Sequence, residues 1–195
     1  MSTGARIRSA RFLAASTGLR IVLTPVVMAL LLADGSHPQT AADVAAALFA
    51  VAAATDWFDG RLARRWGVTT SFGSFLDTTA DKLLVSGGLV ALLAVDRVSP
   101  WIAMIIIGRE LVIMGLRSVL AAQGTVLTPS PLAKVKTTVQ FLAIGLAIVR
   151  PDVTIAGHWL DQWAMLVAAA ITVASAADYL ARSASALSTG SAPRR

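Results

Sequence analysis

Long apolar stretches, each closed by turn-forming or charged residues, recur along the whole chain, and no other feature constrains the fold as strongly. The chain has 195 residues, of which 56% are hydrophobic and 14% are charged, whereas a soluble domain carries about 25% charged residues. A helix needs about 20 predominantly apolar residues to cross a bilayer. The pattern therefore predicts an all-α, polytopic membrane protein.

Six transmembrane helices are expected, with a short N-terminal cytoplasmic segment before the first. Residues 1–182 are expected to form one transmembrane domain, and residues 183–195, which are rich in serine and alanine, a disordered cytoplasmic tail. The expected helices cover residues 19–33, 41–58, 75–95, 101–122, 134–149 and 159–181.

The distribution of lysine and arginine predicts the orientation. Six spans place both termini on one side of the membrane, and that side collects every lysine and arginine except Arg97 and Arg150. Because positive residues are enriched on the cytoplasmic side, we expect both termini in the cytoplasm. The net charge of +6 then reflects contact with anionic membrane lipids, and nucleic acid is not expected as a partner.

Four aspartates lie where the second expected helix ends and the third begins: Asp56, Asp59, Asp77 and Asp81. Helical geometry separates Asp56 from Asp59 by about 60° and Asp77 from Asp81 by about 40°, so each helix presents a pair on one face. Facing carboxylates would repel strongly at low dielectric, and divalent cations would remove that repulsion. Two ions about 3.5–4 Å apart can clamp phosphoryl groups, and oxygen ligands favour Mg²⁺ or Mn²⁺.

Small residues accompany the aspartates. Gly60, Ala63 and Gly73 leave space for a large ligand or for close helix packing, and Arg64 can neutralise a phosphate or pair with an aspartate. The full pattern, D-x2-D-G-x2-A-R-x8-G-x3-D-x3-D, resembles the signature of the CDP-alcohol phosphotransferase family. The resemblance implies a six-helix homodimer in the plasma membrane of a bacterium, whose cytoplasmic active site binds a CDP-linked lipid and two divalent cations, Mg²⁺ or Mn²⁺.

The same resemblance implies roles for individual residues. The metal ligands would be Asp56, Asp59, Asp77 and Asp81, and Asp81 would also be the catalytic general base. The CDP-linked lipid would contact Asp56, Gly60, Ala63, Arg64 and Gly73.

A second group of charged residues comprises Arg109, Glu110 and Arg117 in the fourth expected helix and Lys134 and Lys136 at the start of the fifth. Arg109 and Glu110 could form an ion pair with each other or with another helix of the bundle, and the two lysines could be ordinary cytoplasmic anchors. Taken together, the arginines and lysines predict a cationic pocket that binds the phosphate of an acceptor alcohol.

These segments, R-E-x6-R and K-V-K-T-T-x-Q, resemble the phosphatidylglycerophosphate synthase branch of the family, as do residues 17–20 with Pro25. The Pro-Asn pair that usually precedes this first element is absent before Thr17. The resemblance implies transfer of a phosphatidyl group from CDP-diacylglycerol to sn-glycerol 3-phosphate with release of CMP.

Other acceptors fit the same chemistry: inositol phosphate, phosphatidylglycerol, as in a cardiolipin synthase, or serine. From a different class, the chain could be a divalent-cation transporter or a non-catalytic scaffold. A transport path needs polar residues towards the outer face, but the carboxylates lie at one end of their expected helices, and the remainder of those helices is mainly Ala, Val and Leu. A scaffold would leave the four carboxylates without a function.

Overall fold

The computed structural model describes residues 3–33, 38–66, 71–125, 127–128 and 130–190. Within its helices, the side chains of residues 3–14, 56–66, 71–72, 74 and 186–190 lie outside the description. In the described part of the chain, six helices are joined by short connections, one of which contains a small hairpin. They are α1 (Thr3–Leu32), α2 (Pro38–Trp66), α3 (Ser71–Ala94), α4 (Pro100–Ala122), α5 (Pro131–Val149) and α6 (Leu160–Gly190).

The all-α fold class is confirmed, and each expected apolar run lies almost wholly within one of the six helices. The helices are longer than the apolar runs. α1 already begins at Thr3, α2 continues past residue 58 to Trp66, and α6 continues to Gly190, inside the segment expected to be a disordered tail. Hydropathy marks only the part of a helix that suits lipid, whereas Ala, Arg and Leu favour helix beyond it.

Local signals set several helix ends. Pro38, Pro100 and Pro131 are the first residues of α2, α4 and α5, a position where the missing N–H of proline costs nothing. The Ser130 hydroxyl accepts a hydrogen bond from the backbone N–H of Ala133 at 3.3 Å and so caps α5. At the other end of α5, Arg150 adopts a left-handed conformation with φ 48°.

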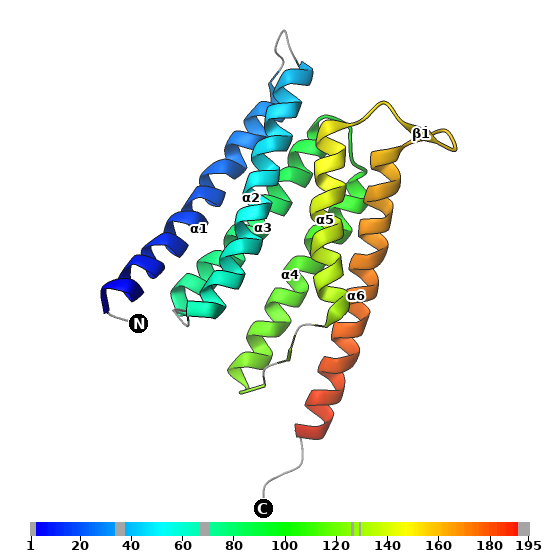
Figure 1. Cartoon of the computed structure of the whole chain (residues 1–195). Coiled ribbons are helices and arrows are strands. Elements are labelled where there is room, and N and C mark those ends of the chain that lie inside the picture. The colour runs from blue at the N-terminus through cyan, green and yellow to red at the C-terminus, as the bar shows by residue number, and fades with distance from the viewer. Residues whose placement is uncertain (1–2, 34–37, 67–70, 126, 129, 191–195) are drawn as a thin grey trace, which may run out of the picture.

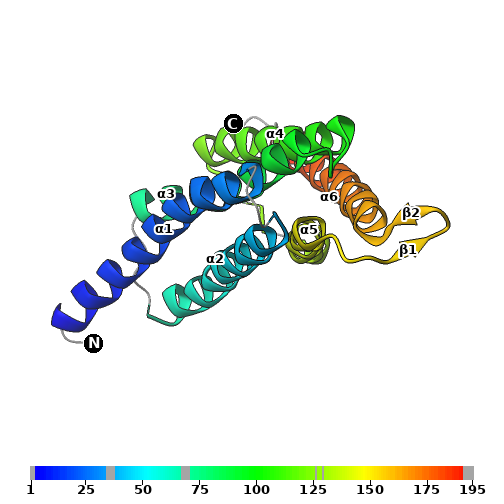
Figure 2. The same ribbon diagram turned by 90° about the horizontal axis from the view of Figure 1, so that it is seen from above.

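Figures 1 and 2 show the helices as a bundle, and Figure 1 shows the start of α1 and the end of α6 at the same end of it. α1 packs against α2 and α3, α6 packs against α4 and α5, and α2 contacts α5 between the two groups. Phe49 of α2 and Phe141 of α5 lie across this junction, with ring centroids 5.8 Å apart. The bundle is thus held together across its middle by apolar side chains, among them Phe49, Leu84, Leu89, Ile106, Ile144, Ile148 and Met165.

Large apolar side chains also cover the outside of the bundle. Trp101 is 73% exposed, and Met104 and Leu142 are each 68% exposed, which is the surface a helical protein presents to lipid tails. Among the described residues, three stretches are long and apolar enough to cross a membrane: Ala15–Leu32, Pro131–Val149 and Leu160–Ser185. These stretches, the composition and the exposed apolar surface identify a membrane protein.

α3 and α4 do not meet this criterion because of their charges. Asp77, Asp81 and Lys82 lie in α3, and Arg109, Glu110 and Arg117 lie in α4, so every stretch of spanning length in either helix contains three charged residues. The charges that interrupt these two helices are those of the candidate site described below.

The connection between α5 and α6 contains a hairpin that the sequence analysis did not predict. β1 (Thr154–Ile155) pairs antiparallel with β2 (His158–Trp159). The two residues between them, Ala156 and Gly157, have φ of 52° and 81°, and a type I′ turn requires positive φ at both positions. Gly157 is the sequence feature that could have predicted this turn, because glycine adopts positive φ readily.

Gly87 of α3 allows α1 to approach closely. A Cβ at this position would lie 2.5 Å from Cγ2 of Thr24 and 3.1 Å from Sδ of Met28. Thr24 cannot move aside easily, since its side chain is β-branched and its hydroxyl donates to the Arg20 carbonyl at 2.9 Å. The α1–α3 contact therefore depends on a residue without a side chain.

Gly87→Ala should lower the free energy of unfolding by about 1–3 kcal/mol, because overpacking forces the two helices apart. Unfolding of the purified protein in detergent measures the effect. Gly145→Ala is the matched control, since a Cβ there meets nothing within 4 Å and alanine favours helix by up to about 1 kcal/mol. Equal destabilisation by both substitutions would contradict the proposed packing at Gly87.

Candidate active site

A pocket of about 560 Å³ lies between α3, α4 and α6 near the ends of these helices that are closer to the termini. Acidic side chains of α3 form one part of its wall, and basic side chains of α4 form another. Tyr179 of α6 and residues of the α4–α5 connection complete it. The lining includes Asp77, Asp81, Lys82, Arg109, Glu110, Ile113, Arg117, Ser118, Thr125, Leu127 and Tyr179.

Asp77 and Asp81 lie one helical turn apart on α3, and both line the pocket. The Asp77 side chain is 44% exposed, and its Oδ1 accepts a hydrogen bond from Nη2 of the buried Arg20 at 2.7 Å. Asp81 Oδ2 lies 2.9 Å from Nζ of Lys82, while its Oδ1 is buried without a hydrogen-bond partner in the described structure. A buried carboxylate oxygen without a partner next to a second carboxylate is a donor set that suits a divalent cation.

The other two predicted metal ligands belong to the last turns of α2. At 1.5 Å per residue, Asp56 and Asp59 lie about 10–15 Å from the end of α2, and Asp77 and Asp81 lie about 9–15 Å from the start of α3. Because only residues 67–70 connect the two helices, the backbones of all four aspartates lie at a similar depth in the bundle. Gly73 is exposed in the first turn of α3. The side chains of Asp56, Asp59, Ala63 and Arg64, and the surroundings of Gly60, lie outside the described residues.

Glu110 is at the centre of a buried ionic cluster. Its Oε2 lies 2.6 Å from Nζ of Lys82 on α3, and its Oε1 contacts Nζ of Lys136 on α5 and lies 3.2 Å from Nη1 of Arg109. The Glu110 side chain is only 3% exposed. Since an uncompensated charge at this depth is costly, the three cations and the one carboxylate stabilise each other as a group.

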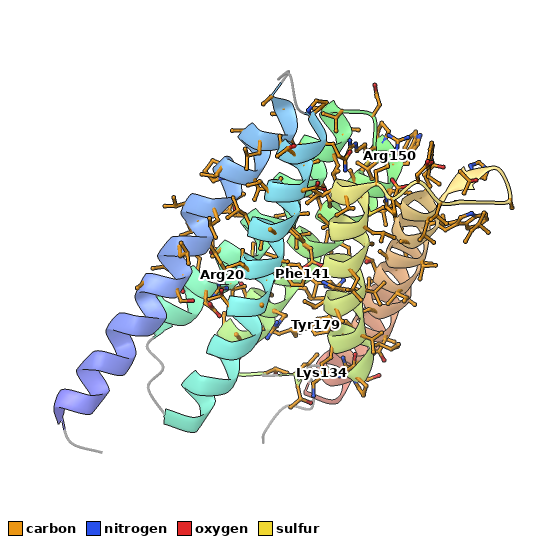
Figure 3. All side chains as sticks on the ribbon, turned by 45° about the horizontal axis from the view of Figure 1, so that its top comes forward. Arg20, Lys134, Phe141, Arg150 and Tyr179 are labelled. Atoms are coloured by element: carbon orange, nitrogen blue, oxygen red, sulfur yellow. The ribbon has the colours of Figure 1, made fainter. Side chains whose placement is uncertain are left out.

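The four predicted acceptor-binding residues have different surroundings. Arg109 and Arg117 line the pocket, and Arg109 also donates to Ser175 of α6 at 2.9 Å. Lys136 is buried against Glu110. Lys134 is exposed near the start of α5, and Figure 3 shows it towards the same end of the bundle as Tyr179, with Arg150 at the opposite end. In the described structure, therefore, the two arginines line the pocket and the two lysines do not.

Lys82 and Tyr179 are not among the predicted site residues, whereas the sequence favours for Glu110 an ion pair with Arg109 or with another helix. Both kinds of pair are present, since Glu110 contacts Arg109 and also joins two further helices through Lys82 and Lys136. The position of Lys82 directly after Asp81 was the available signal, because a lysine within the acidic segment needs an anionic partner at this depth. Tyr179 gave no comparable signal.

Comparison with known proteins identifies the class of this site. Residues 14–174 match the model of the CDP-alcohol phosphatidyltransferase family. This match covers most of the chain and includes all four aspartates of the signature, Arg20 and the Glu110 cluster. The chain belongs to the CDP-alcohol phosphatidyltransferase family, and it is a membrane enzyme of that class.

Three similar bacterial proteins all carry the name CDP-diacylglycerol–glycerol-3-phosphate 3-phosphatidyltransferase. The protein of Bacillus subtilis (strain 168) is 38% identical over 181 residues, which are 87% of this chain and 93% of the relative. The protein of Sodalis glossinidius is 45% identical over 69% of this chain and 75% of its own length. The protein of Escherichia coli (strain K12) is 41% identical over 73% of this chain and 80% of its own length.

Glu110→Gln should destabilise the protein by about 3–5 kcal/mol, because it removes the negative charge that balances the buried Lys136 and Arg109, while Lys82 keeps its contact with Asp81. Unfolding in detergent is the measurement. Asp43→Asn is the control: Asp43 is an exposed residue of α2 whose Oδ1 accepts a hydrogen bond from Gln39 at 3.3 Å, so its loss should cost at most about 0.5 kcal/mol. Similar losses in the two variants would argue against a structural role for the buried cluster.

Proposed function

We propose that this protein transfers a phosphatidyl group from CDP-diacylglycerol to sn-glycerol 3-phosphate and releases CMP, which is the reaction of a phosphatidylglycerophosphate synthase. The observation that carries the proposal is one pocket lined by two signature aspartates on α3 and by two arginines on α4. The aspartates suit metal-assisted transfer, and the arginines suit an acceptor with its own phosphate. The names of the similar proteins support the same substrates.

The proposed metal ligands are Asp56, Asp59, Asp77 and Asp81, holding two divalent cations, Mg²⁺ or Mn²⁺. When bound, such ions stabilise the negative charge that develops on a diphosphate during transfer. Asp56 would share its contacts with the CDP-linked lipid, together with Gly60, Ala63, Arg64 and Gly73. The small residues leave room for the diphosphate and cytidine, and the Arg64 guanidinium supplies a cation beside them.

Asp81 is the proposed general base. Lys82 donates to Asp81 Oδ2 at 2.9 Å and holds that oxygen in place, while Oδ1 lacks a partner in the described structure and can accept the proton of the acceptor 1-hydroxyl. The acceptor oxygen forms a bond to the phosphorus that bears diacylglycerol. The bond from this phosphorus to the bridging oxygen breaks, and CMP leaves with the electron pair.

The acceptor phosphate would bind to the cationic side chains Arg109, Arg117, Lys134 and Lys136. Because Arg117 is exposed and lines the pocket, it is the residue most open to an incoming anion. The positive-inside distribution supports a cytoplasmic position for the pocket and both termini, where a water-soluble polyol phosphate is available. All six helices would then cross the membrane, and two copies of the chain would form a homodimer.

The purified protein should release CMP from CDP-diacylglycerol and Mg²⁺ most rapidly when sn-glycerol 3-phosphate is present. Parallel reactions with inositol phosphate, phosphatidylglycerol and serine test the alternative acceptors. Asp81→Asn should slow CMP release at least about 100-fold, since a positioned general base contributes that much or more, while binding of CDP-diacylglycerol stays measurable. Asp152→Asn, in the exposed connection after α5, should leave the rate unchanged.

If CMP release is faster with another acceptor, that compound and not sn-glycerol 3-phosphate is the substrate. If the protein carries divalent cations into liposomes and releases no CMP, the proposed transfer reaction is wrong and the protein acts as a transporter.

Arg117→Ala should raise the KM for sn-glycerol 3-phosphate about 10- to 100-fold, because charge-assisted hydrogen bonds contribute about 1.5–3 kcal/mol. The KM for CDP-diacylglycerol should change much less, so steady-state kinetics with each substrate varied in turn provides an internal control. Arg150→Ala removes an arginine near Trp159 at the far end of the bundle and should change neither constant. A similar rise in both constants for Arg117→Ala would remove this residue from the acceptor site.

A further inference from the structure

Arg20 is a fully buried arginine in the apolar helix α1, and its side chain is 0% exposed. Its Nη2 donates a hydrogen bond to Asp77 Oδ1 at 2.7 Å. Burying a guanidinium is costly unless the charge is paired and hydrogen-bonded, and ionisable residues at membrane depth usually have a function. Arg20 does not line the pocket in the described structure, so its hydrogen bond to Asp77 is the link through which it can affect a ligand there.

The α1–α3 contact fixes the point from which Arg20 reaches Asp77. Thr24, one turn after Arg20, packs against Gly87 so closely that a Cβ on Gly87 would lie 2.5 Å from its Cγ2. Along α1, Arg20 lies about 6 Å before Thr24, whereas Asp77 lies about 15 Å before Gly87 along α3. The arginine side chain must therefore extend towards the N-terminal end of its helix, the direction in which helical Cα–Cβ bonds tilt.

We propose that Arg20 is a positioning residue for the metal site: it holds the Asp77 carboxylate in one orientation through Oδ1, so that Oδ2 remains available to a divalent cation. This inference rests on the proposed function, in which Asp77 is a metal ligand. The Asp77 side chain is 44% exposed, so the protein interior alone does not fix its rotamer. Carboxylates that bind metals are commonly oriented by a further hydrogen bond, and losing that partner typically weakens metal binding about 10- to 100-fold.

Two effects of Arg20 oppose each other and must be separated. Its hydrogen bond orients a metal ligand and favours metal binding, whereas its positive charge repels a cation nearby. Arg20→Lys keeps the charge but replaces the planar, fixed donors of the guanidinium by a compact and strongly hydrated ammonium group. This substitution therefore changes the positioning of Asp77 at constant charge.

Binding of Mn²⁺ to the purified protein in detergent, followed by electron paramagnetic resonance without lipid substrate, tests the proposal. Arg20→Lys should bind Mn²⁺ about 10- to 100-fold more weakly than the unmodified protein. Its CMP release should recover when Mn²⁺ is raised by the same factor, a rescue that a general loss of folding would not allow. Affinity equal to that of the unmodified protein would overturn the positioning role.

Two further variants keep the outcomes distinct. Arg97→Lys is the matched control, because Arg97 donates to the Ile148 carbonyl at 2.6 Å in the connection between α3 and α4, at the end of the bundle opposite the pocket. It should leave Mn²⁺ affinity unchanged even if stability falls. Asp77→Asn tests the underlying proposal: if it binds Mn²⁺ as tightly as the unmodified protein, or if the unmodified protein binds none, both proposals fail. If Asp77→Asn weakens binding and Arg20→Lys does not, only the positioning role fails.

Discussion

Cationic side chains from three helices converge on the carboxylate of Glu110, and the arrangement of the pocket depends on this cluster. Lys82 comes from α3, Arg109 from α4 and Lys136 from α5. Without the shared carboxylate these cations would repel one another in a medium of low dielectric. The same lysine that contacts Glu110 also contacts Asp81, so the cluster links helix packing directly to the proposed general base.

Apolar contacts and ion pairs contribute differently to the arrangement of the helices in this bundle. Apolar contacts such as Phe49 against Phe141 join the two groups of helices, but such contacts tolerate small shifts between helices. Ion pairs at fixed distances do not, since they lose most of their strength when the geometry changes. Arg20 with Asp77 links α1 to α3 in addition to their close packing at Gly87, and the Glu110 cluster links α4 to α3 and α5. Of the three helices that bound the pocket, α3 and α4 are therefore positioned by these bonds.

Much of this arrangement can be predicted from the sequence, because helix geometry is periodic and the signature is local. The apolar runs predict the six helices, and the spacing of Asp77 and Asp81 predicts two carboxylates on one face of α3, as observed. The partners of these residues cannot be predicted in this way. Glu110 meets Lys136 across 26 positions and Arg20 meets Asp77 across 57, and no periodicity within one helix indicates which side chains of another will face it.

The hairpin between α5 and α6 has a practical consequence for establishing membrane topology. Its turn, at Ala156 and Gly157, is exposed at the end of the bundle opposite the two termini. The chain contains no cysteine, so a single cysteine introduced at residue 156 would be its sole thiol. A maleimide reagent that cannot cross the bilayer, applied to intact cells, would then label this turn only if it faces the outside, and the pocket itself would remain unmodified.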